Sequence, residues 1–304
     1  MLILLVPIII ILFILVSIFF FIRRSLIAGA IFLFVAVIIN YYTQTFPFHP
    51  SYFYTSSDKK DNQIRILSYN IRYNSEYLRN NKDSLSALIS FIKQQDADIL
   101  VLPESRISST NKKLRKKLDK IYPYNLDAGY NGNKYYIETY VFSRYPIYNA
   151  RQYGKHYIYE MDIKVSEKCT VKLVACHLES NQSNSSLNKG DGFLNNITNG
   201  YNKRIKEVQM ICDSLQNYQG PLIISGDMND LSGSKVLSTL QNKYNLDDAW
   251  WKSGLGYGST SFSKYLFFRL DHILFSKHFK SSAIDIPNVH FSDHYPIVTD
   301  LELQ

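Results

Sequence analysis

Polar or ionisable residues lie at the ends of six short apolar runs in this 304-residue sequence. The six segments read SYN (68–70), LPES (102–105), CHLES (176–180), SGDMND (225–230), LDHILFS (270–276) and SDHYP (292–296). A residue just past a buried strand lies at the rim of a sheet, where side chains can be assembled on a rigid frame. The candidate site residues are Asn70, Glu104, His177, Asp227, Asn229, Asp271, Asp293 and His294.

Among these residues, Asp293 and His294 form the most suggestive pair, because a carboxylate beside an imidazole suits metal binding and acid–base chemistry. Asp271 lies inside a strand-like run, and a buried carboxylate there needs a partner. Taken alone, Glu104 is also typical of a solvated turn carboxylate, and Asn70 of a turn former. The residues are informative only as a set.

The segments that must position these residues alternate between strand-like and helix-like patterns from Ile64 onward. Apolar, β-branched runs predict strands at Ile64–Asn70, Ile99–Leu102, Leu222–Ser225, Phe267–Phe275 and Pro296–Leu301, with several more between Tyr135 and Cys176. Helical spacing predicts helices through Leu85–Ile92, with Asp83 as N-cap, and through Ile205–Leu215. The polar run Asn181–Asn202 predicts a long mobile loop with a functional role.

The order of these elements predicts the fold class. Consecutive strands without intervening helices imply antiparallel pairing, because parallel neighbours need a long crossover. The expected class is therefore α+β, or mixed α/β, with helices covering sheets. We place one large domain at 63–304, after a juxtamembrane linker at 43–62 and an N-terminal region at 1–42.

The N-terminal region contains two long uncharged runs separated only by Arg23 and Arg24. As helices, Met1–Ile22 would span about 33 Å and Ser25–Tyr42 about 27 Å, close to the hydrocarbon thickness of a bilayer. Neither run has the polar face of a core helix, and no positive charge precedes the first run as in a secretory signal. We predict two transmembrane helices that form a hairpin, rather than a cleaved signal peptide.

Aromatic residues cluster just beyond the second run, as is typical of a membrane interface. They are Tyr41, Tyr42, Phe46, Phe48, Tyr52, Phe53 and Tyr54. If the arginine pair stays inside, both ends of the hairpin face outward and the large domain is periplasmic or extracellular. Lys59 and Lys60 weaken this argument because they are also positive.

The formal net charge of +8 favours polyanionic partners or anionic surfaces, and no obligate protein partner is implied. The three cysteines give no metal-binding spacing. Cys169 and Cys176 fall on one predicted strand, about 23 Å apart, so they cannot pair with each other. At most one disulfide, with Cys212, is possible, and three buried free thiols are the preferred interpretation.

Taken in order, the six segments resemble the motifs of the endonuclease/exonuclease/phosphatase superfamily. This superfamily includes pancreatic-type deoxyribonucleases, abasic-site endonucleases, neutral sphingomyelinases and inositol polyphosphate 5-phosphatases. The resemblance runs from about Ile64 to Leu301. It implies a four-layer α/β/β/α sandwich, in which two mostly antiparallel sheets are flanked by helices.

The resemblance also implies a divalent cation, Mg²⁺ or Mn²⁺, beside a phosphate ester. Asn70 and Glu104 would help to hold the cation, and Asp293 would lie near it. Carboxylate and amide oxygens suit such a hard cation, which offsets the charge that develops on phosphate. His294 would be the general base that activates water, oriented by Asp271.

Further roles follow from the same resemblance. Asp227 and Asn229 would position the nucleophile and the scissile phosphate. His177 would stabilise the phosphoryl oxygens or donate a proton to the leaving group, and Glu138 aligns loosely with a carboxylate that supports this histidine. Because nothing indicates a covalent nucleophile, direct in-line attack by water is the expected route.

The substrate stays open at this point. Nucleic acid, a phospholipid or sphingolipid head group and a soluble phosphate ester all fit the implied chemistry, and a membrane anchor favours lipid. An alternative is a non-catalytic binding or scaffolding protein with the same fold. Replacement of either histidine or of Glu104 would have favoured that alternative, and none is replaced.

Overall fold

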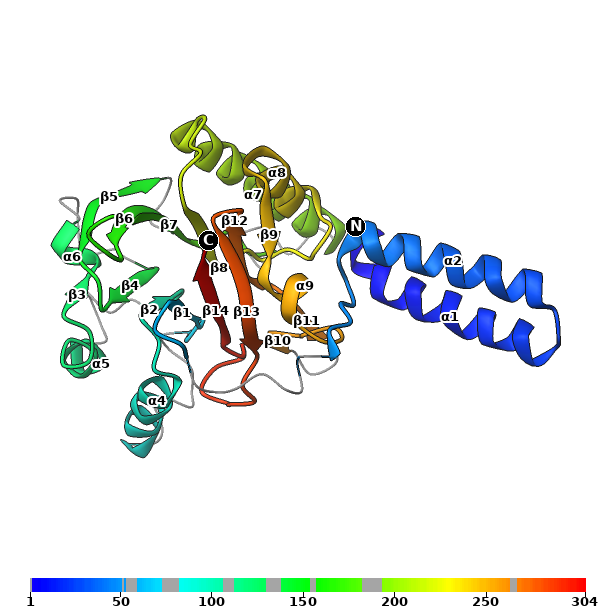
Figure 1. Ribbon diagram of the computed structural model, residues 1–304, viewed down its shortest axis with the longest axis horizontal. Coiled ribbons are helices and arrows are strands. Elements are labelled where there is room, and N and C mark those ends of the chain that lie inside the picture. The colour runs from blue at the N-terminus through cyan, green and yellow to red at the C-terminus, as the bar shows by residue number, and fades with distance from the viewer. Residues whose placement is uncertain are drawn as a thin grey trace.

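Two six-stranded sheets packed face to face form the centre of the protein in a computed structural model (Figure 1). The structure describes residues 2–50, 52, 59–72, 82–105, 112–129, 138–153, 157–181, 193–262 and 267–304. The first sheet has the order β13 (Phe279–Asp285), β14 (Ile297–Leu303), β1 (Gln63–Ser68), β2 (Ile99–Leu102), β4 (Tyr140–Ser143) and β3 (Tyr124–Asn125). The second has the order β5 (Ile147–Tyr153), β6 (Ile158–Lys164), β7 (Thr170–His177), β8 (Leu222–Asp227), β12 (Asp271–Ser276) and β9 (Leu246–Asp248). A separate ribbon pairs β10 (Ser261–Phe262) with β11 (Phe267–Phe268).

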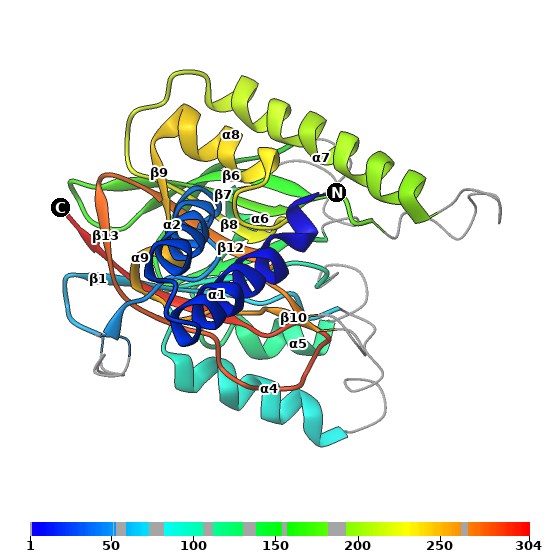
Figure 2. The same ribbon diagram turned by 90° about the vertical axis from the view of Figure 1, so that its right-hand side faces the viewer.

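Helices cover both outer faces of this sandwich (Figure 2). On the first sheet lie α4 (Lys82–Gln95) and α5 (Lys112–Leu118), and on the second lie α7 (Phe193–Leu215) and α8 (Lys235–Tyr244). Leu88 and Leu114 are buried in the larger apolar cluster, which includes the first sheet, whereas Val208 and Leu240 are buried in a second cluster with residues of the second sheet. The expected four-layer α/β/β/α sandwich is therefore confirmed. Two short helices, α6 (Leu126–Gly129) and α9 (Ala249–Ser253), lie between strands.

Two pairs of neighbouring strands are parallel, β1 with β2 and β7 with β8, and every other pair among the described strands is antiparallel. The helices α4 and α7 supply the crossovers that parallel pairs require. In the first sheet, Ser68 at the end of β1 lies opposite both Val101 and Ile297. The end of β2 and the start of β14 therefore lie at the same rim as the end of β1.

Three predictions about local structure were wrong. Residues 193–202 of the expected loop form the start of α7, because Tyr201 packs on the apolar core beneath this helix and Arg204 pairs with Asp230. Phe267–Phe275 is not one strand, because the buried Arg269 interrupts it between β11 and β12. The helix α4 begins at Lys82, so Asp83 lies in its first turn rather than before it. Residues 182–192 of the predicted loop lie outside the described part of the chain.

The N-terminal region forms a helical hairpin that projects from the domain (Figure 1). It consists of a short η1 (Leu2–Leu5), α1 (Val6–Ile22) and α2 (Leu26–Thr43), with Arg23 and Arg24 at its far turn. Ser17 Oγ donates to the carbonyl oxygen of Gly29 at 2.8 Å, which ties the two helices together. Both helices are long and apolar enough to cross a bilayer, a test that a signal sequence near the N-terminus also passes.

The three cysteines are free in this structure. Cys176 and Cys212 are buried, as expected, and Cys169 is partly exposed. Burial raises the pKa of each thiol, so none is activated as a nucleophile.

Candidate active site

Three of the predicted residues form one row across the second sheet. His177 on β7 lies directly opposite Asp227 on β8, and Asp227 lies directly opposite Asp271 on β12. Residues opposite one another on neighbouring strands present their side chains on the same face of a sheet. The strand register alone therefore brings a histidine and two carboxylates together.

Gly226 makes this register possible. It has a φ of +143°, and a Cβ at this position would lie 1.8 Å from the carbonyl oxygen of Cys176 on β7. Any side chain would push β7 and β8 apart beside the row. The glycine of the SGDMND segment thus allows the close strand contact that places Asp227 next to His177.

The rim of the first sheet supplies Asn70, two residues after β1, and Glu104, two residues after β2. Asn70 Nδ2 donates to Glu104 Oε1 at 3.0 Å and to Asp227 Oδ2 at 2.9 Å, so this amide joins the two sheets. Asn70 Oδ1 accepts the backbone N–H of Arg72 at 3.0 Å. Because the nitrogen faces the carboxylates, Asn70 orients them here, and binding of a cation through Oδ1 requires the amide to turn over.

His294 closes the site from the segment before β14. Its Nδ1 donates to Asp271 Oδ2 at 2.7 Å, and its Nε2 lies 3.7 Å from Asp227 Oδ2. Burial alone would lower the pKa of His294, but the charges of Asp271 and Asp227 outweigh it and raise this pKa to about 10. Burial also raises the pKa of Asp271, against the effect of the imidazolium. The imidazole therefore has a fixed orientation, with Nε2 turned toward the other acidic groups.

His177 has no hydrogen-bond partner for either ring nitrogen within the described ranges, although both nitrogens are buried. Its Nε2 lies 3.6 Å from Glu104 Oε1 and 3.9 Å from Asp227 Oδ2. The support predicted from Glu138 is therefore not formed in this structure. Unpaired buried polar atoms are costly, and beside two carboxylates they indicate a group that is bound during function.

The donor atoms fit a hard divalent cation. Glu104, His177 and Asp227 each offer one ligand atom, and these atoms all lie within 4.8 Å of one another; Asp227, Asp271 and His294 do the same. No lysine or arginine in the described ranges forms an ion pair with Glu104, Asp227 or Asp271. Carboxylate oxygens at this spacing, with no lysine or arginine partner among the described residues, favour Mg²⁺ or Mn²⁺.

Asp293 lies outside both groups. Its Oδ2 forms an ion pair with Arg72 Nη1 at 2.6 Å, and its Oδ1 accepts from Ser292 Oγ at 3.2 Å. Both partners of the ion pair are more than one-third exposed, so the pair is weak. Arg72 was not singled out by the sequence, where its only signal is its position two residues after Asn70.

Asn229 positions Asp227. Its backbone N–H donates to Asp227 Oδ1 at 2.8 Å, and its Nδ2 donates to the carbonyl oxygen of Leu178 at 2.8 Å. It adopts a left-handed φ of +49°, which asparagine tolerates better than most residues. Asn229 therefore joins the chain after β8 to the chain after β7 and fixes the carboxylate between them.

Thr260 supports the site and has no signal in the sequence. Its Oγ1 accepts the backbone N–H groups of Leu270 and Asp271, both at 3.0 Å. Its carbonyl oxygen accepts the N–H of Tyr295 at 2.6 Å, and the next residue, Ser261, forms a β-bridge with His294. Thr260 thus holds β12, which carries Asp271, and the segment before β14, which carries His294, at a fixed separation.

Residues 67–294 match the family model described as the endonuclease/exonuclease/phosphatase family. Solved structures with the same fold include truncated TDP2 from Caenorhabditis elegans (16% identity, TM-score 0.57, covering 81% of this chain and 100% of that chain). Others are the human nocturnin catalytic domain with bound sulfate (18%, 0.56, 81% and 95%) and SmcL (16%, 0.55, 79% and 99%). No curated protein matches in sequence.

At these identities the solved structures show the fold, and the family match covers most of the chain. The strand order, the row of site residues and this match all agree, and the protein belongs to the endonuclease/exonuclease/phosphatase family, whose members are hydrolases of phosphate ester bonds.

Proposed function

We propose that this protein is a membrane-anchored, divalent-cation-dependent phosphoesterase that hydrolyses a phosphodiester or phosphomonoester by direct attack of water. The observation that carries the proposal is the His177–Asp227–Asp271 row, closed by His294 at a hydrogen-bond distance of 2.7 Å from Asp271. An oriented imidazole beside carboxylates that have no lysine or arginine partner in the described ranges is suited to acid–base work near a cation.

Glu104 and Asp227 are the residues that would hold Mg²⁺ or Mn²⁺, with Asn70 hydrogen-bonded to both. The position of Asp293 near this cation is a prediction from the family resemblance. The bound cation would offset the charge of the phosphate and lower the pKa of His294 from its raised value toward neutrality. The alternative, a non-catalytic binding protein, would need no oriented base. The Asp271–His294 pair therefore favours the enzyme.

His294 Nε2 takes the proton of the attacking water, because Nδ1 is held by Asp271. The water oxygen bonds to phosphorus, and the ester P–O bond breaks with its electron pair on the departing oxygen. His177, whose ring nitrogens have no partner among the described residues, donates a proton to that oxygen or stabilises the phosphoryl oxygens. Asn229 keeps Asp227 in position throughout.

Hydrolysis of bis(p-nitrophenyl) phosphate by the full chain in detergent tests this proposal. We expect release of p-nitrophenol with Mg²⁺ or Mn²⁺ and no release with excess chelator. Binding of the diester without turnover, in protein shown to be folded, would instead favour the non-catalytic alternative.

We also propose that the hairpin spans a membrane and that the catalytic domain faces outward. A cysteine at the exposed Asp61, in a Cys169→Ser background, should react with an impermeant thiol reagent on intact cells. The two remaining cysteines are buried, so they should give little background. Labelling of this cysteine only after lysis would reverse the orientation.

A further inference from the structure

The segment that follows α2 is bound to the catalytic domain rather than free. Asn40 Oδ1, in the last turns of α2, accepts the N–H of Phe46 at 2.7 Å. The N–H of Gly256 donates to the carbonyl oxygen of Pro47 at 3.0 Å, and His49 Nε2 donates to the carbonyl oxygen of Trp251 at 2.9 Å. The predicted linker is therefore docked on the domain over residues 44–50.

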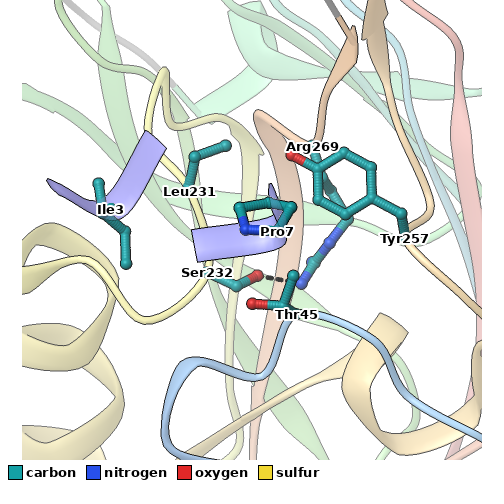
Figure 3. A pocket seen from close by; sticks show the side chains of 7 residues that line it. All are labelled: Ile3, Pro7, Thr45, Leu231, Ser232, Tyr257 and Arg269. Carbon is teal, nitrogen blue, oxygen red and sulfur yellow. Dashed lines mark hydrogen bonds between the residues drawn. The ribbon is translucent and has the colours of Figure 1, made fainter. Parts of the chain in front are cut away.

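The loop that follows Asp227 lies directly against this anchor. A Cβ on Gly233, which has a φ of +75°, would lie 2.7 Å from the Cα of Thr43, the last residue of α2. Leu231 and Ser232 line a small pocket together with residues from the start of the chain, the linker and the strand region: Ile3, Pro7, Thr45, Tyr257 and Arg269 (Figure 3). The catalytic loop thus touches both ends of the hairpin.

This contact limits the distance between the site and the bilayer. Leu231 is four residues from Asp227, so their Cα atoms are at most about 14 Å apart. The first candidate membrane span begins at Ile3 and the second ends at Thr43. Leu231 shares a pocket with Ile3, and Gly233 lies against Thr43, so both contacts lie where the hydrocarbon would begin. The head-group layer is itself about 5–8 Å thick on each side of a bilayer.

Arg269 makes the connection rigid. One terminal nitrogen, Nη2, donates to Ser232 Oγ and to the carbonyl oxygen of Gln44, the latter at 3.4 Å. The other, Nη1, donates to Asp248 Oδ2 at 2.8 Å. Arg269 lies two residues before Asp271, so one buried side chain links the anchor, the catalytic loop and a catalytic strand.

Exposed aromatic side chains also occur on the side of the domain from which the hairpin projects. Phe48 is 78% exposed and Phe267, on the β10–β11 ribbon, is 59% exposed. This ribbon lies on the side of the domain from which the hairpin projects (Figures 1 and 2), and its Ser261 bridges to His294. Aromatic rings at this level are typical of side chains that enter a membrane interface.

We propose that the active site takes its substrate from the bilayer that holds the hairpin, and that the substrate is a phosphate ester in a lipid head group. This inference rests on the phosphoesterase function proposed above. Water adds to the lipid phosphorus, one P–O ester bond breaks, and the alcohol oxygen takes the proton that His177 supplies. The docked linker and Arg269 keep the site beside the head groups, so the substrate is presented at high local concentration.

Reconstitution of the full chain into vesicles tests this inference. The vesicles contain phosphatidylcholine, phosphatidylethanolamine, phosphatidylglycerol, phosphatidylinositol and sphingomyelin, and water-soluble phosphorus products are followed by ³¹P NMR with Mg²⁺. We expect hydrolysis of lipid in the protein's own vesicles to exceed hydrolysis in separate vesicles, at equal lipid concentration, by about tenfold or more.

Two surface variants sharpen the test. Phe48→Ser and Phe267→Ser should each lower the rate on vesicle lipid about threefold to tenfold through lost burial of an aromatic ring in the interface, without changing turnover of bis(p-nitrophenyl) phosphate. Tyr148→Ser is the matched control, because Tyr148 is 50% exposed on β5, away from the hairpin (Figure 1). It should change neither rate.

The outcomes separate the two proposals. Cleavage of the soluble diester or of DNA with no lipid cleavage overturns the lipid substrate. Equal rates of lipid cleavage on the two sets of vesicles overturn access from the protein's own bilayer. Both results leave the phosphoesterase standing. Loss of turnover on every substrate, including the soluble diester, overturns the phosphoesterase itself. Equal effects of Phe48→Ser and Tyr148→Ser on lipid hydrolysis also contradict the proposed membrane contact.

Discussion

Two buried carboxylate–histidine pairs are built on neighbouring residues of β12. Asp271 pairs with His294 at 2.7 Å on one face of the strand, and His272 pairs with Asp248 at 2.9 Å on the other. The pairs share residue types, distance and burial. They differ in their surroundings, because Arg269 Nη1 lies 2.8 Å from Asp248 Oδ2, whereas no arginine or lysine in the described ranges pairs with Asp271.

This difference distinguishes the structural pair Asp248–His272 from the active-site pair Asp271–His294. Burial raises the pKa of Asp248, but the charge of Arg269 and the hydrogen bond from His272 outweigh it, so this pKa lies well below its usual range. At Asp271 burial prevails and the pKa is raised. A buried carboxylate cluster without its own arginine leaves its charge for a bound cation to neutralise, whereas Asp248 is already compensated.

The largest expected effect is on the rate of hydrolysis, when each of the two histidines is replaced separately by glutamine. His294→Gln should lower hydrolysis by about 10³-fold because it removes the general base, while the melting temperature shifts by only a few degrees. His272→Gln should retain activity and lower the melting temperature, because the carbonyl oxygen of Asp230 loses its partner. Wild-type turnover in His294→Gln would contradict the mechanism.

The next largest effect is on stability, when each of the two aspartates is replaced separately by asparagine. Asp248→Asn leaves the guanidinium of Arg269 buried without a counter-charge, so the free energy of unfolding should fall by about 3–5 kcal/mol. Asp271→Asn should cost much less, because His294 can lose its proton when its partner is neutral, but it should impair hydrolysis. Urea denaturation measures the stability, and equal losses in the two variants would remove the distinction between the clusters.

A divalent cation should bind at the active-site cluster and not at the Asp248–His272 cluster, and its binding should stabilise the folded protein. At about one hundred times its Kd, Mg²⁺ or Mn²⁺ should add about 2.7 kcal/mol to the free energy of unfolding, read as a thermal shift that chelator reverses. Glu104→Gln should reduce this shift. Glu167→Gln, at an exposed carboxylate, is the control and should keep it. A full shift in Glu104→Gln would show that the cation binds elsewhere.

The smallest effect concerns pH. The folded-state pKa of Asp248 is depressed, so its contribution is present above the unfolded pKa of about 3.9 and is lost only as pH falls through the lower folded value. The difference in stability between the wild type and Asp248→Asn should therefore stay constant from pH 7 to about pH 4.5 and narrow only in stronger acid. A difference that narrows near neutral pH would show that Asp248 is not held by Arg269.

The sequence predicted the parts of the site that follow strands. Ile99–Leu102 was predicted with its observed bounds, and the ends of β1 and β8 were within two residues of prediction, so Asn70 and Asp227 were expected at a rim. Apolar β-branched runs are local signals, and the motif order supplied the rest. Their convergence could not be derived from spacing, because it depends on the register between strands far apart in the chain.

The cluster of Asp248, Arg269 and His272 could not be predicted for the same reason. His272 had no expected role, since its partners come from β9 and from the loop after β8. The docked linker was also missed, because its contacts with Trp251 and Gly256 join segments separated by about two hundred residues. The prediction of a loop at residues 193–202 was wrong for a local reason. The segment is polar by composition, but Tyr201 and Arg204 give its helix a buried side.

The pairing of β1 with β14 has a consequence for biosynthesis. Gln63 lies opposite Glu302, so one edge of β1 stays unpaired until β14, more than two hundred residues later, has been translated. The hairpin is translated long before that, while the domain is still incomplete. A truncation before β14 would therefore leave β1 as an unprotected edge, which favours self-association of the truncated chains.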